Sequence, residues 1–570
     1  MKKISKYIFI LLTAVAVSSC IKEVLPVGGS QTQAQVSESK SAMLSMIKAI
    51  PASMTTSGTM GYASGYGDHT DFGIPGIHLR FEHMLEDVAT MATTPFYNRF
   101  YAYDMNEAQG YQYTYCAYFW DAYYTWIRLV NDVVLSIKPV VEESVDAGDE
   151  ETAQLRDILG QAYAYRAMCY LDLARLYEPK ENDYTDVSSV LGLTVPIVDE
   201  FTSIDQTKDN PRVPRNQMYK FIINDLNQAL ELLNDSDRTF SRPTVNAVYG
   251  MLARLYLELG YAAEKDQFND INEYPEFESV KMFTKAAEYA RKLIDEGGYS
   301  PLTQSQWEDP VNGFNNAASN GAWIWGFSLV AENLGNLLTF VSHMSSEASW
   351  GYARYAQFGV SSRLYDMIPD SDFRKHSWLD PKKEEYYTYK FAGTEADKQD
   401  FLNGSPAAKP YQSLKFRPAM SECSDFNIGN AADYCLMRIE EMYFIEMEAK
   451  AHLEGVEAGK KLLKEFMTKY RDKSYSRNPS SLPDFLTELL LQKRVEFWGE
   501  GILLFDYKRL DAGITRSYPG SNHAGVFRLN TIGRSPQWNI VITRAEFQSN
   551  TAINDTNNNP DPTGKIELAQ

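Results

Sequence analysis

The chain has 570 residues, too many for one compact core at roughly 100–200 residues per domain, so we expect two or three domains or one long helical array. Hydrophobic residues make up 44% and charged residues 23%, a globular balance that excludes wholesale disorder. Acidic residues outnumber Lys and Arg by 75 to 55, and the resulting charge of −20 argues against a nucleic-acid partner.

The first residues, MKKISKYIFILLTAVAVSSC, have the features of a bacterial secretion signal. A basic head precedes the apolar run Tyr7–Val17, which is shorter than the roughly 17–25 residues of a permanent membrane span. Small residues lead directly to Cys20, as in a lipobox, so we expect residues 1–19 to be removed and Cys20 to be acylated. Ordinary secretion with an incidental cysteine is the alternative. Residues 20–42, polar after the anchor, would then be the lipid anchor and linker.

Helical periodicity dominates the next part, residues 43–302. Apolar residues recur at three- and four-residue steps, most clearly over Ala153–Tyr177. Alanines stand where neighbouring helices would cross closely, which is typical of a tetratricopeptide-like array in which each helix pair buries its face against the next. The helices predicted here are Tyr113–Lys138 (ended by Pro139), Ala153–Tyr177, a helix through Leu233 that Asn216 caps, Val245–Leu259, and Phe283–Glu296 (ended by Gly297).

The second part, residues 303–550, changes character. Pro301–Asp425 is rich in Gly, Asn, Ser, Trp and Tyr with little helical periodicity, which indicates loops. Helical patterns resume at Asp433–Leu453, Lys460–Tyr470 and Pro483–Gly499, and residues 551–570 have the composition of a flexible polar tail. We therefore predict a mainly α fold, with a helical-repeat body and a loop-rich, partly helical second part. Nothing after the signal has 18 uncharged apolar residues in a row, so we expect a lipid anchor and no membrane span.

The sequence carries few motifs for chemistry. It has no metal-binding histidine spacing and no nucleotide-binding glycine loop, so we expect no metal and no cofactor. A segment near the C-terminus has the spacing of oxygen-bearing side chains found in calcium-binding loops, but Pro560 stands where glycine is needed. A polar tail is the simpler interpretation. The residues in question are Asp555, Asn557, Asn559 and Asp561.

Four cysteines remain after Cys20. Cys116 and Cys169 are expected to be buried, and Cys423 and Cys435 could pair in an oxidising compartment.

Acidic residues cluster on two predicted helices, which raises the question of catalysis. Their three- and four-residue spacing favours structural ion pairs within each helix. A glycosidase needs two carboxylates facing each other across a cleft, and sequence alone does not place them, so a helical glycoside hydrolase or lyase is the rival interpretation. The acids are Glu440, Glu441, Glu446 and Glu448 beside Arg438, and Glu496 and Glu500 beside Arg494.

Aromatic residues reach 13%, more than core filling obviously requires. A sugar ring presents an apolar C–H face and a rim of hydroxyls, which an exposed Trp or Tyr with Asn, Asp or Arg at its edge matches. We predict a ligand platform formed by Trp350, with Trp378 or Tyr355 and with Tyr66. The two regions that qualify are Gly58–Arg80, with Tyr66 and Asp68, and Gly321–Trp378, with Trp323, Trp350, Tyr355 and Trp378.

Other aromatic residues have a simpler explanation. Trp323 and Trp325 alternate as on a strand, so we expect at least one of them in the core. The tyrosines between Tyr111 and Tyr124 do not all fit the inner face of one helix, so we expect some to face a partner.

Several segments, in order along the chain, resemble the SusD/RagB family of Bacteroidetes outer-membrane lipoproteins. Departures from the family pattern, such as Met218, Glu440 and Gln492, lie in predicted structural helices and leave the fold in place. The segments are QAYAYRAMCYLDLARLYEP (161–179), LGLTVPIVDE (191–200), RVPRNQMYKFIINDLNQALELL (212–233), VNAVYGMLARLYLELG (245–260), AAEYARKLIDEGGYSPL (286–302), CLMRIEEMYFIEMEAKAH (435–452), LLLQKRVEFWGEGILLFDYKRL (489–510) and WNIVITRAEFQSN (538–550).

This resemblance implies a tetratricopeptide-like body with a loop-rich lid, a lipid-anchored, surface-facing place at the outer membrane, and partnership with a SusC-like TonB-dependent transporter. The implied ligand is an oligosaccharide, or a peptide in the RagB branch. We therefore expect a non-catalytic lipoprotein that captures an oligosaccharide and delivers it to the transporter, with peptide capture as the alternative.

Overall fold

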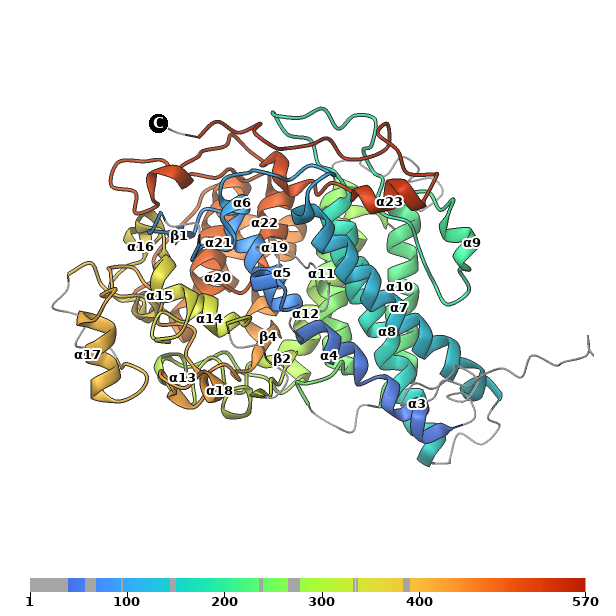
Figure 1. Cartoon of the computed structure of the whole chain (residues 1–570), viewed down its shortest axis with the longest axis horizontal. Coiled ribbons are helices and arrows are strands. Elements are labelled where there is room, and N and C mark those ends of the chain that lie inside the picture. Colours follow the sequence, from blue (N-terminus) through green and yellow to red (C-terminus); the bar gives the residue numbers. More distant parts are fainter. Residues whose placement is uncertain are drawn as a thin grey trace, which may run out of the picture.

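Figure 1 shows the computed structural model of the chain, which describes residues 39–56, 68–93, 96–143, 150–234, 239–264, 277–331, 334, 337–382 and 390–568. Long antiparallel helices fill one side of the molecule, and short helices joined by loops fill the other (Figure 1). None of the helices in these ranges is both long and apolar enough to cross a membrane. The mainly α fold predicted from the sequence is confirmed.

The helical body is an array in which each helix packs on the next. α7 (Thr114–Glu143) packs on α8 (Glu150–Tyr177), α8 on α10 (Arg215–Leu232), and α11 (Val245–Glu264) on α12 (Ser279–Glu296). The predicted alanine crossings are present, because Ala253 and Ala290 are fully buried on α11 and α12. Gly260 permits a close approach there, since a Cβ on it would lie 2.6 Å from the Phe283 ring.

The array does not end with the first part of the chain. α12 packs on α19 (Ile439–Glu454), α19 on α20 (Val456–Tyr470), and α21 (Leu482–Glu496) packs on both of these and on α22 (Leu503–Leu510). The C-terminal helices therefore continue the repeat body, and one hydrophobic core runs through both. The loop-rich residues between α12 and α19 are an insertion into this array, as Figure 1 shows.

The insertion and the N-terminal segments are built from short elements and two small antiparallel sheets. β1 (Val88–Thr90) pairs with β3 (Phe358–Val360), and β2 (Trp323–Phe327) pairs with β4 (Tyr434–Arg438). The short helices are α3 (Lys40–Met46), α4 (Ala49–Thr55), α5 (Ile74–His83), α6 (Tyr101–Asp104), α9 (Ile204–Thr207), α13 (Gln304–Glu308), α14 (Phe340–Met344), α15 (Tyr352–Ala356), α16 (Ser362–Met367), α17 (Glu395–Asn403), α18 (Phe426–Gly429) and α23 (Arg544–Ser549).

Three predicted boundaries were wrong. α7 continues through Pro139 for one further turn, and Val141 in that turn is buried. Asn216 lies inside α10, whose N-cap is Pro214. The helix predicted from Asp433 begins only at Ile439, because the preceding residues form β4 against β2, and pairing with a strand more than 100 residues away leaves no periodic signal in the sequence.

The C-terminal residues were also misjudged. Residues 551–568 pack on the body, with Ile553 and Ile566 buried. Asn559, one of the residues with the calcium-loop spacing, donates to the Tyr177 and Ile540 carbonyls and accepts from Arg212, so its amide has a structural role. Cys423 and Cys435 are both free buried thiols, as are Cys116 and Cys169.

Candidate functional site

Pairing of β1 with β3 brings two distant segments of the chain together. α15 ends at Ala356, and its C-cap Gln357 takes the left-handed backbone conformation (φ 57°) that turns the chain into β3. The strand after this turn pairs with β1, and the Ala92 N–H continues the ladder by donating to the Ala356 carbonyl. The residues that follow β1 therefore lie beside α15.

Aromatic side chains from both segments meet at this place. The rings of Tyr97 and Tyr355 stack, with centroids 4.8 Å apart and planes 19° from parallel. Phe96 stands edge-on to Tyr97, at 5.1 Å and 90°, and is 56% exposed. Tyr97 and Tyr355 are half-buried, so part of each remains accessible. We call Phe96, Tyr97 and Tyr355 the aromatic platform.

The buried Arg99 side chain joins the platform to a neighbouring group of polar side chains. The Arg99 guanidinium lies 4.6 Å from the Phe96 ring centre and 5.5 Å from that of Tyr352. The Tyr352 hydroxyl is 2.5 Å from His69 Nδ1, and burial raises the pKa of this tyrosine, so it stays protonated and can donate. Burial lowers the pKa of His343, which stacks on Tyr352, to about 3, and this histidine is therefore neutral near pH 7.

Such a surface suits a particular kind of ligand. Offset aromatic rings offer apolar faces and edges to C–H groups, while the tyrosine hydroxyls remain available for polar partners. No group of three or more His, Cys, Asp or Glu side chains in the described ranges is placed to hold a metal ion. The arrangement favours reversible binding of a molecule that has both apolar faces and hydroxyl groups.

The structure separates the residues predicted as a site. Tyr355 belongs to the platform, but Trp378 is fully buried with its ring 5.6 Å from Trp498, and Trp323 is only 4% exposed. Neither tryptophan presents a face to a ligand, so both leave the candidate site. Trp325 is buried as well, so the expectation that at least one of Trp323 and Trp325 lies in the core is met by both. Tyr66, the side chain of Asp68, and Cys20 lie outside the described residues.

Trp350 also lies in the loop-rich part, and its indole hydrogen bond and ring packing involve residues outside the aromatic platform. Its indole N–H donates to Asn430 Oδ1 at 3.3 Å, and the ring packs with Ala419 against a small cluster containing Ala432. A Cβ on Gly429 would lie 2.3 Å from this ring, which shows how closely the backbone of α18 approaches it. Trp350 is half-buried, and its ring packs mainly against the protein around it.

Sequence reasoning missed Phe96, Tyr97 and Arg99. A signal existed, since FYNRFY (96–101) is an aromatic and polar run like those chosen elsewhere. What the sequence did not contain was the long-range pairing of β1 with β3, which places this run against Tyr355.

The acidic clusters form ion pairs, as predicted, but mainly between elements instead of within one helix. Arg438 donates to Glu496 at 2.8 Å and to Glu500 at 2.9 Å, and Arg471 donates to Glu496 at 2.7 Å and Glu440 at 3.0 Å. These side chains are at most 6% exposed. The full set, which we call the ion-pair core, is Asp372, Arg374, Lys415, Arg438, Glu440, Arg471, Glu496 and Glu500.

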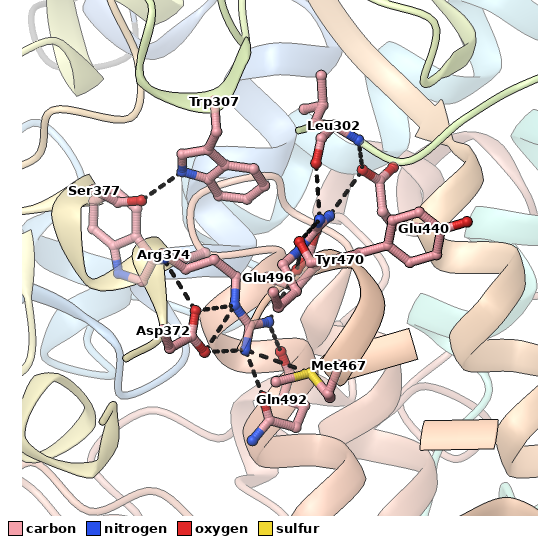
Figure 2. Close-up of polar contacts among 12 residues, drawn as sticks. Leu302, Trp307, Asp372, Arg374, Ser377, Glu440, Met467, Tyr470, Gln492 and Glu496 are labelled. Atoms are coloured by element: carbon pink, nitrogen blue, oxygen red, sulfur yellow. Dashed lines mark hydrogen bonds and ion pairs between the residues drawn. The ribbon is translucent and has the colours of Figure 1, made fainter. Parts of the chain in front are cut away.

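Figure 2 shows how this core joins the two parts of the molecule. Arg374, from the loop-rich part, bonds Asp372 beside it and reaches Gln492 and Glu496 on α21 (Figure 2). Trp307 donates to Ser377, and its ring lies 5.4 Å from the Arg471 guanidinium. Each of these carboxylates is therefore bound by buried cations, and the core fixes the loop-rich part on the helical body.

A cavity of about 50 Å³ lies between α8, α11 and the C-terminal helices. Its charged lining residues are paired with one another, for example Arg254 with Glu441 at 2.6 Å and Lys493 with Asp506 at 2.7 Å. The space is enough for one or two water molecules, at about 30 Å³ each, and is too small for a sugar ring.

A helical-repeat body with a loop-rich insertion that exposes an aromatic surface is typical of binding proteins in which rigid elements support recognition loops. Two family models match the chain: one described as "Starch-binding associating with outer membrane" matches residues 76–257, and one described as "SusD family" matches residues 348–565. The chain belongs to the SusD/RagB family, which confirms the resemblance seen in its sequence. No curated protein matches the chain.

Solved structures share the fold. A SusD-like carbohydrate binding protein from Bacteroides vulgatus is 20% identical, with a TM-score of 0.65 over 91% of this chain and 98% of that one. A SusD superfamily protein from Bacteroides thetaiotaomicron is 18% identical, with a TM-score of 0.62 over 92% and 100%. A laminarin binding SusD-like protein is 16% identical, with a TM-score of 0.58 over 91% and 98%. At these identities the likeness concerns the fold alone.

Proposed function

We propose that this protein is a non-catalytic, lipid-anchored receptor of the outer membrane, which captures an oligosaccharide on the aromatic platform and delivers it to a SusC-like TonB-dependent transporter. The observation that carries the proposal is the stacked pair Tyr97–Tyr355, with the exposed ring of Phe96 beside it. Rings that are held by packing lose little conformational entropy when a ligand stacks on them.

Two further observations support a saccharide ligand. One family model is described by starch binding at the outer membrane, and one solved relative binds laminarin. The platform also stands on the loop-rich side, over a rigid body, which is where recognition usually lies in scaffold folds.

Anchoring and transport are parts of the same proposal. The signal-like residues 1–19 and Cys20 support a lipid anchor, and the family resemblance supports the transporter. Tyr111 and Tyr113 are 38% and 40% exposed on the body, as expected for tyrosines that face a partner.

The positions of the carboxylates support the proposal that the protein is not catalytic. The acidic residues of the two clusters are engaged in ion pairs, whereas a glycosidase holds two carboxylates across an open cleft. Chromatography of a bound oligosaccharide after prolonged incubation tests this part, and shortened products would contradict it.

The binding test begins with a glycan array that includes starch and laminarin oligosaccharides, next to a set of peptides. Calorimetry on the best ligand then compares Phe96→Ala with Phe201→Ala. Phe201 is also exposed (69%) but lies shortly before α9, which Figure 1 shows on the opposite side of the molecule from α15. We expect weaker binding only for Phe96→Ala. Binding of peptides and of no glycan would replace the proposal with the peptide alternative.

A further inference from the structure

A second hollow lies in the loop-rich part, with a volume of about 140 Å³. Three segments of the chain line it, namely residues 309–311 with 313–316, residues 417–420, and residues 431–433. We call it the three-segment pocket. Its volume is below the roughly 300–1,000 Å³ of sites for drug-sized ligands and suits a single small ring.

Hydrogen bonds between the segments fix the shape of the pocket. The Arg417 N–H donates to Asn315 Oδ1 at 3.0 Å, and the Asp433 N–H donates to the Asn315 carbonyl at 3.1 Å. Asp433 Oδ2 in turn accepts from the Ala317 N–H at 3.1 Å. The lining residue Ala419 packs, together with Trp350, against a small apolar cluster that contains Ala432, which also lines the pocket. The pocket is therefore formed before any ligand arrives.

An unusual backbone places an apolar side chain at the rim. Met420 and Ser421 are consecutive non-glycine residues with φ of 52° and 61°, a conformation that costs L-residues free energy and that clusters at binding sites. Met420 is nevertheless 78% exposed, and Val311, also at the pocket, is 45% exposed. The strained turn therefore holds an apolar side chain at the rim, where it offers a ligand a surface to pack on.

The polar lining indicates the chemistry of that ligand. Asp309, Asp433, Asn315 and Asn316 are among the lining residues. One oxygen of each carboxylate accepts from backbone N–H groups, and the other oxygen takes no part in these bonds. Among its described lining residues the single cation is Arg417, and Glu347 binds this guanidinium at 2.6 Å through both carboxylate oxygens. Carboxylates accept hydrogen bonds and repel anions, so the ligand must bring donors and carry no negative charge.

We propose that the three-segment pocket is a second saccharide site, which holds one neutral or amino-bearing sugar ring and rejects uronic acids. The C–H face of the ring lies against the apolar rim of Met420 and Val311, and its hydroxyl or ammonium groups donate to Asp433 and the asparagine amides. The site is independent of the aromatic platform, and its chemistry does not rest on that platform's function.

Methyl NMR of the mature protein with 13C-labelled methionine methyls tests this site directly. Titration with glucose and with glucosamine should shift the Met420 methyl signal with a dissociation constant of about 1–10 mM, as expected for a ligand of this size. Glucuronate should leave it in place. Met367, which lies at a different groove, is the control signal and should not shift.

Variants separate this site from the platform. Asn316→Ala should weaken binding about fivefold or more, whereas Asn312→Ala, four residues away and outside the lining, should not. The Met420 shift should persist in the double variant Tyr97→Ala/Tyr355→Ala. Loss of the shift in that variant would show that both belong to one site and would overturn the proposal. Absence of any shift with the neutral and amino sugars, or an equal shift with glucuronate, would also overturn it and leave the platform proposal untouched.

Discussion

Neutralising Glu496 is the sharpest test of the ion-pair core. This carboxylate accepts from Arg471, Arg438 and Arg374 at 2.7–2.9 Å, and none of the four side chains is more than 1% exposed. Glu496→Gln keeps the size of the side chain but leaves buried guanidinium groups without their shared counter-charge. Removal of one partner of a buried ion pair costs about 3–5 kcal/mol. We expect a loss of that size in the free energy of unfolding.

The loss converts into a modest shift of the melting temperature. At about 2.1 cal/mol/K per residue, a chain of this length that unfolds as one unit has an unfolding entropy of about 1.2 kcal/mol/K. The expected decrease in Tm is therefore about 3 °C, which calorimetry resolves. The control is Asp205→Asn, which removes an exposed ion pair with Lys208 and should change stability by less than about 1 kcal/mol.

A double-mutant cycle distinguishes charge from packing. Arg471→Met should cost less in the Glu496→Gln protein than in the wild type, since the arginine has lost its main partner. Strict additivity of the two changes, or a wild-type Tm for Glu496→Gln, would refute the claim that these charges hold the loop-rich part on the body.

The same carboxylate predicts a pH dependence. Burial alone would raise the pKa of Glu496, but the guanidinium groups of Arg471, Arg438 and Arg374 outweigh it and hold this pKa well below its ordinary value. Below about pH 4.3 the unfolded chain binds a proton that the folded protein does not, so this part of the stability is present above that pH and is lost as the pH falls further. The acid-induced decrease in stability should be smaller in Glu496→Gln.

Three further outcomes are expected. Desolvation raises the pKa of the buried Glu82 from 4.5 to about 8, so between these pH values the folded protein keeps a proton that the unfolded chain releases. The free energy of unfolding therefore falls as the pH rises through this range, and Glu82→Gln should flatten that decline. Urea unfolding at several pH values measures it, and an unchanged slope would contradict the prediction. Trp378→Ala should cost about 3–5 kcal/mol as a core deletion, and more than Trp350→Ala, and denaturant titrations that reverse this order would show that burial has been misread. Cys20→Ala should move the protein to the soluble fraction in cells that lack the barrel partner, and retention on membranes there would rule out the lipid anchor.

The helical body was largely predictable because its signal is local. Apolar residues at three- and four-residue spacing located α8, α11 and α12, and the alanines marked where helices cross. The continuation of the array from α12 to α19 was not predicted, since it depends on contact across the long insertion.

The site was less predictable for the same reason. A Gly- and Ser-rich stretch gives no period from which to tell an exposed tryptophan from a buried one, and Trp378 and Trp323 proved to be core residues. Tyr355 was predicted, but its partners Phe96 and Tyr97 become neighbours only through the pairing of β1 with β3.

Calorimetric binding of the best array oligosaccharide to Tyr355→Ala tests the central claim most directly. Loss of a stacked ring should cost about 2 kcal/mol, which weakens the affinity about thirtyfold, while circular dichroism and Tm remain those of a folded protein. Tyr113→Ala, which removes another exposed tyrosine, should bind as the wild type does. Wild-type affinity in the double variant Tyr97→Ala/Tyr355→Ala would contradict the account and place oligosaccharide capture elsewhere on the molecule.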